Sequence, residues 1–266
     1  MVSWNNIKKD HHSRPSLRGY HAQVFSLFPH SCGTCSRVKS GEYVLSLLKE
    51  APNTEKTILF LRHSKRNSFA GIPDHLRPGV EITPEGRLMA KEFGTSLGQV
   101  FPGRRLLLAH TTALRCRMTA ECILQGYSPG TRVPMIEYPE KIGDPVRNYP
   151  AFIDLRETLG WQVLIRKWLD GEISPEVIED PVVYSRTLLH TLLSSQGTGN
   201  GDLFVAIVHD ITLFPIISRV FRKKMTSIDF LNGIVISSLR STAEIRFSDA
   251  DCSLKRVVGA EWTSEV

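Results

Sequence analysis

Two apolar runs in this sequence, residues 58–61 and 203–208, each end in a pair of reactive side chains. The pairs are Arg62–His63 and His209–Asp210. Short apolar runs predict buried strands, and α/β folds bind ligands at the carboxyl ends of their strands. We therefore expect two histidines, an arginine and a carboxylate at one edge of a sheet. A single histidine at a strand end is more often structural, but two such ends with complementary charges favour a reactive site.

A third segment adds another arginine. Residues 111–120 read Thr-Thr-Ala-Leu-Arg-Cys-Arg-Met-Thr-Ala, which indicates a strand-to-helix turn with Arg115 in the first helical turns. Guanidinium groups bind phosphate oxygens bidentately and stay charged at any relevant pH. Taken alone, an arginine is better explained as half of a surface salt bridge. The joint pattern instead predicts that Arg62, Arg66 and Arg115 surround a phosphoryl group while His63 attacks phosphorus.

The elements that would position these residues alternate between strand and helix. The Thr83-Pro84-Glu85-Gly86 segment predicts a helix start, with a threonine N-cap and proline at the first helical position. We expect strands at 58–61, 106–109, 203–208, 233–239 and 243–247, and helices after Thr83 and at 113–125, 161–169, 182–193 and 211–221. This alternation predicts an α/β fold, a three-layer α/β/α sandwich with a mostly parallel central sheet.

Composition favours one folded domain with an extension at its start. A chain of 266 residues that is 41% apolar can bury a sizeable core. Residues 1–40 are basic and lack periodicity, which predicts a flexible N-terminal extension; its composition also resembles an organellar transit peptide, the less favoured alternative. The domain is expected over 41–266. Within it, residues 126–180 are rich in proline, glycine and charge and predict a cap-like insertion over one end of the sheet.

The remaining features exclude several classes of protein. No stretch approaches the roughly 20 apolar residues of a membrane helix, and no signal-peptide core is visible, so we expect a cytoplasmic protein without a membrane partner. The five cysteines are not a disulfide framework. Cys32 and Cys35 have the spacing of half a zinc site, with His30 nearby, or of a redox motif, but incidental thiols are the favoured interpretation.

The net charge of +6 permits a nucleic-acid partner. A phosphate-ester substrate explains a basic site equally well. Because no stripe of interleaved aromatic and basic residues is present, nucleic-acid binding is the less favoured function.

Four segments, in this order, resemble the histidine phosphatase superfamily. Leu61-Arg62-His63-Ser64-Lys65-Arg66 resembles its R-H-G-x-R signature, and Thr83 to Gly86 resembles its T-x-x-G helix start. Residues 115–120 are similar to its R-C-x-x-T-A helix, and 209–210 to its H-D pair. Together the segments span about 56–240. Each is a weak signal by itself, whereas four in the expected order are specific.

The resemblance implies a role for each matching residue. His63 would be phosphorylated, Asp210 would protonate the leaving group, and the phosphoryl group would be bound by Arg62, Arg66, Arg115 and His209. Arg66 and the H-D pair are typical of the acid-phosphatase-like branch, which makes the mutase-like branch the less favoured one. Ser64 departs from the usual glycine. The chain is also shorter than the secreted members of that branch, so their substrates are not carried over.

A second carboxylate competes for the role of the acid. Residues 155–160 resemble the L-x-E-x-x-G segment that holds the acid in the mutase-like branch, which would make Glu157 the proton donor. We favour Asp210, because chain geometry places it next to His209.

The sequence thus predicts a phosphomonoesterase that acts on a phosphorylated small molecule or protein through a phosphohistidine. Four positive or hydrogen-bonding groups can supply the charge stabilisation that a divalent metal provides elsewhere, so neither a metal nor a cofactor is expected. The alternatives are a catalytically silent phosphate-binding or scaffold protein and a phosphomutase. Neither the substrate nor the oligomeric state can be predicted.

Overall fold

The computed structural model of the protein describes residues 40–50, 56–128, 135–137, 144–194, 201–239 and 242–259. The predicted extension, apart from its last residue, lies outside the described residues, and so do Cys32 and Cys35. In the described parts of the chain, none of the helices is long and apolar enough to cross a membrane.

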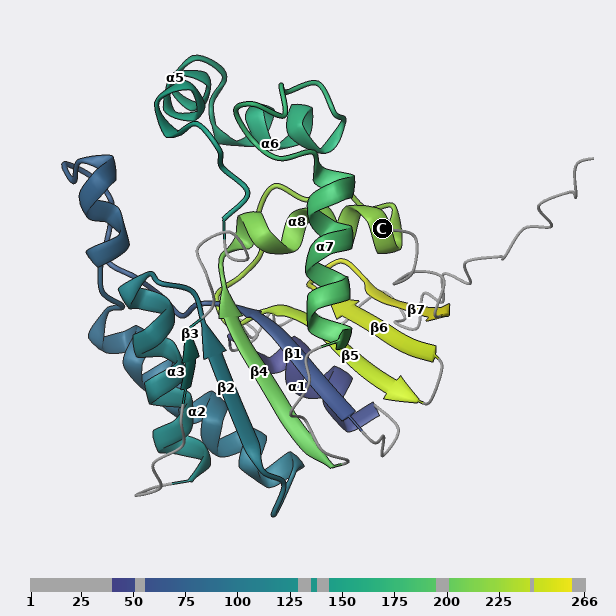
Figure 1. Ribbon diagram of the computed structural model, residues 1–266. Helices are drawn as coiled ribbons and strands as arrows, with labels where there is room; N and C mark the ends of the chain where they lie inside the picture. Colours follow the sequence, from purple (N-terminus) through teal and green to yellow (C-terminus); the bar gives the residue numbers. More distant parts are fainter. Residues whose placement is uncertain are drawn as a thin grey trace, which may run out of the picture.

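A seven-stranded mixed sheet occupies the centre of the molecule, with strand order β3-β2-β4-β1-β5-β6-β7 (Figure 1). Neighbouring strands are parallel from β3 to β1 and antiparallel from β1 to β7. The strands are β1 (Lys56–Arg62), β2 (Leu106–His110), β3 (Met135–Glu137), β4 (Asp202–Val208), β5 (Gly233–Leu239), β6 (Thr242–Ser248) and β7 (Ser253–Gly259). The two strands that end in the polar pairs, β1 and β4, are adjacent and parallel.

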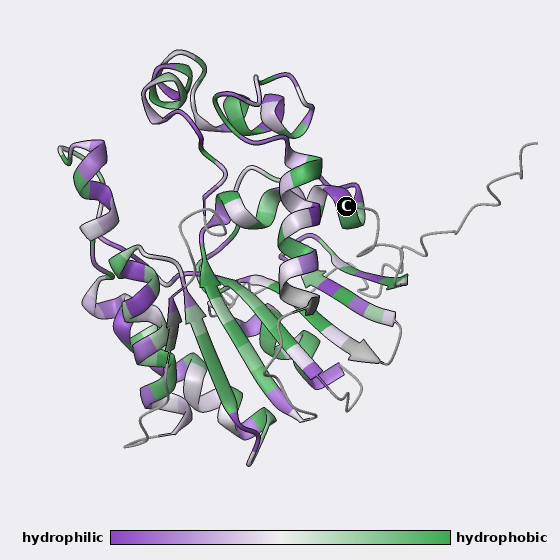
Figure 2. Ribbon diagram, in the orientation of Figure 1, coloured by the Kyte–Doolittle hydropathy of each residue, from purple (hydrophilic) through white to green (hydrophobic). Residues whose placement is uncertain are grey.

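Helices cover both faces of the sheet, which gives three layers (Figure 1). Side chains alternate along β1: Leu59 and Leu61 belong to one apolar core, and Ile58 and Phe60 to the other. The first core contains α1 (Glu42–Glu50), α2 (Pro84–Val100) and α3 (Leu114–Tyr127), and the second contains α6 (Trp161–Leu169), α7 (Pro181–Ser194) and α8 (Asp210–Phe221). Figure 2 shows the hydrophobic central strands between these helices. The predicted three-layer α/β fold is confirmed.

Two elements of the segment 126–180 differ from the expectation. Strand β3 pairs in parallel with β2, so this segment adds an edge strand to the sheet. A helix, α5 (Tyr149–Leu159), precedes the expected α6 and is capped by Asn148, whose side-chain oxygen accepts a hydrogen bond from the Ala151 amide at 3.2 Å. A three-residue strand is too short for periodicity to reveal. By contrast, the Asn-Tyr-Pro start of α5 was a readable helix signal.

Two further elements were not predicted. The 3₁₀ helix η1 (Asp74–Gly79) lies between β1 and α2 in the chain, and β7 closes the antiparallel side of the sheet. Only η1 is relevant to the site, because Arg115 contacts it.

Candidate active site

The register of the central strands places the two polar pairs side by side. Arg62 lies opposite Val208 in the parallel β1–β4 pair, and the His63 amide donates to the Val208 carbonyl at 2.9 Å. The residues that follow Arg62 and Val208, His63 and His209, therefore lie side by side at the carboxyl ends of the two strands. The ring centroids of His63 and His209 are 5.5 Å apart, with an interplanar angle of 71°. This is the arrangement expected for the carboxyl ends of neighbouring parallel strands.

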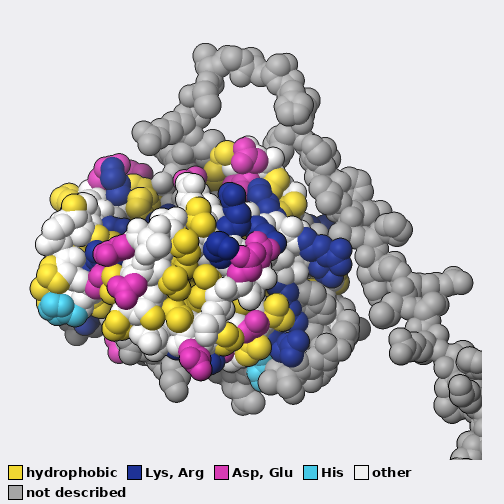
Figure 3. Space-filling model, turned by 90° about the horizontal axis from the view of Figure 1, so that it is seen from above, with side chains coloured by type: hydrophobic (Ala, Val, Ile, Leu, Met, Phe, Trp, Pro, Cys, Tyr) yellow, Lys and Arg dark blue, Asp and Glu magenta, His cyan; other side chains and the backbone are white. Residues whose placement is uncertain are grey.

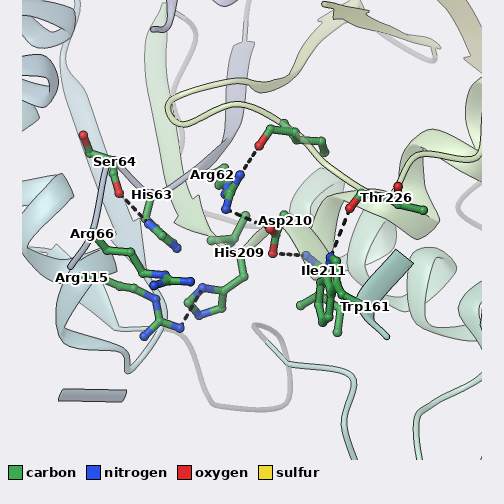
Figure 4. A network of polar contacts seen from close by, with 12 residues as sticks. Arg62, His63, Ser64, Arg66, Arg115, Trp161, His209, Asp210, Ile211 and Thr226 are labelled. Atoms are coloured by element: carbon green, nitrogen blue, oxygen red, sulfur yellow. Dashed lines mark hydrogen bonds and ion pairs between the residues drawn. The ribbon is translucent and has the colours of Figure 1, made fainter. Parts of the chain in front are cut away.

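The structure brings the six predicted residues together (Figure 4). The two imidazole rings and the guanidinium groups of Arg66 and Arg115 point toward one another. A nitrogen of Arg115 lies 3.4 Å from Nδ1 of His209, and Arg62 pairs with Asp210 at 3.1 Å. Arg115 is held by the Arg77 carbonyl of η1, to which it donates at 3.0 Å.

His63 is held in the tautomer that a nucleophile needs. Its ring is buried, and Nδ1 lies 2.8 Å from the Ser64 carbonyl. A carbonyl only accepts hydrogen bonds, so Nδ1 carries the hydrogen and, in the neutral ring, Nε2 carries the lone pair. Burial, followed by the nearby His209 and Arg115, lowers the pKa of His63 well below its usual value. The imidazole is therefore neutral at pH 7.

His209 is also neutral, with the hydrogen on its other nitrogen. Arg115 can only donate, so Nδ1 of His209 accepts, and Nε2 lies 3.2 Å from the Thr111 hydroxyl. Burial and the neighbouring Arg115 lower the pKa of His209 well below its usual value. The Cys116 sulfur lies 3.8 Å from Nδ1 of His209. Burial raises the pKa of the Cys116 thiol to about 11. An uncharged thiol therefore packs against this histidine.

The arginines carry hydrogen-bonding groups that nothing in the described chain satisfies. The Nε atoms of Arg62 and Arg115 are buried and have no hydrogen-bond partner among the described residues. Burial lowers the pKa of Arg115, and burial together with Arg115 and Arg62 lowers the pKa of Arg66 to about 10. Buried cationic donors without partners are costly. A dianion bound among them would supply both the acceptors and the opposite charge.

The two candidate acids lie in different surroundings. Asp210 is the first residue of α8; one carboxylate oxygen accepts from the Ile211 amide at 2.9 Å and the other pairs with Arg62. Glu157 is exposed on α5. Of the two, Asp210 is the one drawn in the network of Figure 4.

Several residues of the four segments that resemble the histidine phosphatase signatures hold the backbone near His63 in place. The Ser64 hydroxyl donates to the Gly86 carbonyl at 2.8 Å, and the Ser64 amide donates to the Thr119 hydroxyl at 3.1 Å. Thr83 caps α2 by accepting from the Gly86 amide at 2.9 Å. A Cβ atom on Gly86 would lie 2.1 Å from the Lys65 carbonyl oxygen, a distance that only glycine avoids. These contacts fix the segment between His63 and Arg66 against α2 and α3.

Four side chains near the site were not predicted from the sequence. The Thr111 hydroxyl contacts His209, and the Phe69 and Phe230 rings lie under arginines of the cluster. The carboxylate of Asp144, in the segment 126–180, acts electrostatically on Arg115. Thr111 was signalled by its position at the end of β2. No local pattern distinguishes the other three, because their neighbours come from distant parts of the chain.

Among the residues that the structure describes, no cluster of three or more His, Cys, Asp or Glu side chains is arranged to hold a metal ion. Figure 3 shows the face on the α5 and α6 side of the molecule. On it, basic and acidic side chains are interspersed, with hydrophobic side chains between them.

Comparison with known proteins identifies the fold. No protein-family model and no curated protein matches the sequence. Among solved structures, the fold is similar to a phosphoglycerate mutase from Bacillus anthracis str. Sterne, with a TM-score of 0.50, 12% identity, and coverage of 80% of this chain and 97% of the mutase.

Two phosphatases are also similar. A mycobacterial glucosyl-3-phosphoglycerate phosphatase in complex with VO3 has a TM-score of 0.48 and 15% identity, covering 76% of this chain and 96% of its own. A phytase from Klebsiella sp. ASR1 has a TM-score of 0.46 and 13% identity, covering 77% of this chain and 88% of its own.

The chain is therefore an α/β protein in which the polar ends of two parallel strands, β1 and β4, meet at one edge of a mixed sheet. Its fold is similar to that of the phosphoglycerate mutase, with the three-layer α/β arrangement that the sequence predicts. The resemblance seen in the four sequence segments is confirmed at the level of the fold.

Proposed function

We propose that the protein is a phosphomonoesterase that forms a phosphohistidine at His63. One observation carries this proposal: a buried, neutral imidazole with its lone pair on Nε2 lies among guanidinium groups, two of which have a buried Nε without a partner among the described residues. A nucleophile beside preorganised cationic donors is the arrangement that phosphoryl transfer requires.

In the first proposed step, Nε2 of His63 attacks phosphorus in line with the ester oxygen. The phosphorus–oxygen bond breaks, its electron pair stays with the leaving oxygen, and Asp210 donates the proton. Water then attacks the phosphohistidine, the phosphorus–nitrogen bond breaks, and Asp210 takes the proton from water. In both steps Arg62, Arg66 and Arg115 stabilise the equatorial oxygens.

Two contacts must change when a phosphoryl group binds. Arg62 pairs with Asp210 in the described state, and we propose that the phosphoryl group replaces this carboxylate as the partner of Arg62. Asp210 is then free to carry the proton. Both ring nitrogens of His209 are engaged, so a phosphoryl oxygen would replace Thr111 as the acceptor at Nε2.

The proposed reaction needs no metal, because guanidinium groups supply the positive charge. We further propose that it takes place in the cytoplasm on a phosphorylated small molecule or phosphoprotein. Turnover of a panel of phosphorylated metabolites, phosphopeptides and nucleotides, each with and without chelator, tests the substrate class and the metal independence together.

His63→Asn tests the nucleophile, and His110→Asn is its matched control. His110 is also buried at a strand end, with Nδ1 2.8 Å from the carbonyl of the next residue. In both variants the side-chain amide of Asn places a donor near the former position of Nδ1, and the nitrogen Nε2 is lost. We expect His63→Asn to lose hydrolysis of an aryl phosphate by at least about 10³-fold, as for a lost nucleophile, and to give no phosphohistidine in an alkaline quench.

His110→Asn should stay within about tenfold of the wild type, since its Nε2 has no proposed role in the chemistry. A wild-type protein that turns over without a phosphohistidine, or a His63→Asn variant within tenfold of the wild type, would rule out the covalent mechanism.

A further inference from the structure

Arg66 is the proposed phosphate ligand with the weakest anchoring. Its guanidinium donates to the carbonyl of the adjacent Asn67 at 2.8 Å, and it takes part in no ion pair within the described residues. Arg62, by contrast, pairs with Asp210, and Arg77 pairs with Asp74. Among the described residues, therefore, no carboxylate holds Arg66 by a direct ion pair.

The charges around Arg66 repel it. Besides burial, Arg115, Arg62 and Arg77 all act to lower the pKa of Arg66, and the nearby Asp210 acts in the opposite direction. Like charges in a partly buried cluster disfavour the ordered position of the guanidinium. A further attraction is needed to keep Arg66 in place when no anion is bound.

The ring of Phe69 supplies that attraction. The guanidinium carbon of Arg66 lies 3.3 Å from the ring centroid, and those of Arg77 and Arg115 each lie 5.3 Å from it. All three distances fall within the roughly 6 Å over which an aromatic face attracts a cation. One ring thus contacts three guanidinium groups that repel one another.

The backbone on both sides of Phe69 is fixed. The Asn67 amide donates to the Glu81 carbonyl at 3.0 Å, and the Ile72 amide donates to the Phe69 carbonyl at 3.0 Å. Arg66 itself forms a backbone bridge with Ile82. The ring is therefore presented to the cluster by a tethered loop, so its position is preorganised.

We infer that Phe69 is a positioning residue for phosphoryl binding: its ring holds Arg66 in the site until an anion binds. The inference rests on the proposed function, because it assumes that the arginine cluster binds a phosphoryl group. Phe69 touches neither the nucleophile nor the acid in the described contacts, so it acts through Arg66.

A double-mutant cycle on Phe69 and Arg66 tests the inference, with binding of inorganic phosphate measured by calorimetry. A cation–π contact contributes about 0.5 to 2 kcal/mol, so Phe69→Leu should weaken phosphate binding about 2- to 30-fold. KM for an aryl phosphate should rise by a similar factor with a smaller change in kcat. Phe69→Trp should bind phosphate at least as well as the wild type.

In an Arg66→Ala background, Phe69→Leu should have at most a twofold further effect, since the closest guanidinium contact of the ring is already gone and those with Arg77 and Arg115, at 5.3 Å, are longer. Equal losses in both backgrounds would mean that Phe69 acts by packing alone, and the inference would be wrong. Phe101→Leu, which removes the ring 4.8 Å from Arg104, controls for loss of an aromatic side chain elsewhere and should leave phosphate binding unchanged.

Fluorination of the Phe69 ring provides a test that does not depend on truncation. Successive fluorines weaken the negative face of the ring with little change of shape, so phosphate affinity should fall stepwise with their number. An affinity independent of fluorination overturns the inference. If the wild type binds no phosphate at all, the proposed function and the inference fail together, whereas normal wild-type binding with unaffected Phe69 variants overturns the inference alone.

Discussion

At the residue scale, His63 and His110 show how surroundings decide what an imidazole can do. Both lie at strand ends with Nδ1 2.8 Å from the next carbonyl. His63 in addition lies beside His209 and the arginines that lower its pKa. The same local geometry therefore occurs in two surroundings, and the proposed nucleophile is the histidine that lies among the arginines.

The proposed general acid, Asp210, is also tested at the residue scale. Asp210→Asn should slow hydrolysis of alkyl phosphates far more than that of activated aryl phosphates, because an alkoxide needs a proton to leave and an activated phenolate does not. General acid catalysis is worth about 10² to 10⁴ in rate, so the two substrate types should differ by up to that factor. Comparison of kcat/KM for the two substrates is the measurement.

Glu157→Gln is the control for this prediction, since Glu157 is exposed on α5. It should affect both substrates alike and by less than about tenfold. A leaving-group-dependent loss in Glu157→Gln, with none in Asp210→Asn, would assign the acid to the inserted segment and favour the mutase-like alternative.

At the element scale, the start of α2 fixes the segment that follows His63. Gly86→Ala places a Cβ atom 2.1 Å from the Lys65 carbonyl oxygen, so the backbone must move. We expect the free energy of unfolding to fall by about 1 to 3 kcal/mol, as for other overpacked sites. Because the same segment carries His63 and Arg66, kcat/KM should also fall by at least about tenfold.

Gly79→Ala, in η1, is the matched control, because no heavy atom would lie within 4 Å of its new Cβ. It should change the free energy of unfolding by less than about 0.5 kcal/mol. Urea denaturation and aryl phosphate hydrolysis of both variants give the comparison. Equal effects in the two variants would show that the close contact between α2 and Lys65 does not set the site geometry.

At the scale of the whole molecule, the two buried histidines link stability to pH. Their pKa values are lowered in the folded protein, so below the unfolded value of about 6.5 the unfolded chain binds protons that the folded chain does not. The free energy of unfolding should therefore fall as pH drops below about 6.5. Each histidine contributes up to about 1.4 kcal/mol per pH unit.

Urea denaturation between pH 7.5 and 5.5 measures this slope. His63→Asn and His209→Asn should each reduce it relative to the wild type, and the double variant should reduce it further. Variants with the wild-type slope would mean that the pKa values of these histidines are not lowered in the folded protein, which would contradict this prediction.

Much of the fold and of the site could be predicted from the sequence, because the signals are local. Apolar runs mark the central strands by burial alone. The start of α2 is marked by Thr83, whose side chain caps the helix, and by Pro84, which has no amide hydrogen to leave unpaired. The reactive pairs follow directly from where the two runs end. Strand β3 was missed because three residues show no periodic pattern, and α5 was missed although its Asn-Tyr-Pro start was a readable signal.

Only the tertiary structure decided how these pieces meet. The order β4-β1-β5 and the Arg62–Val208 register bring His63 to His209, and residue spacing along the chain does not encode either. The same holds for the partners of the arginines. Whether a guanidinium meets a carboxylate, a ring or nothing depends on segments distant in sequence, and so does the burial that keeps both histidines neutral. The sequence by itself determined which reactive groups are present, and packing decided their charge states and neighbours, because pKa values and contacts depend on the three-dimensional surroundings.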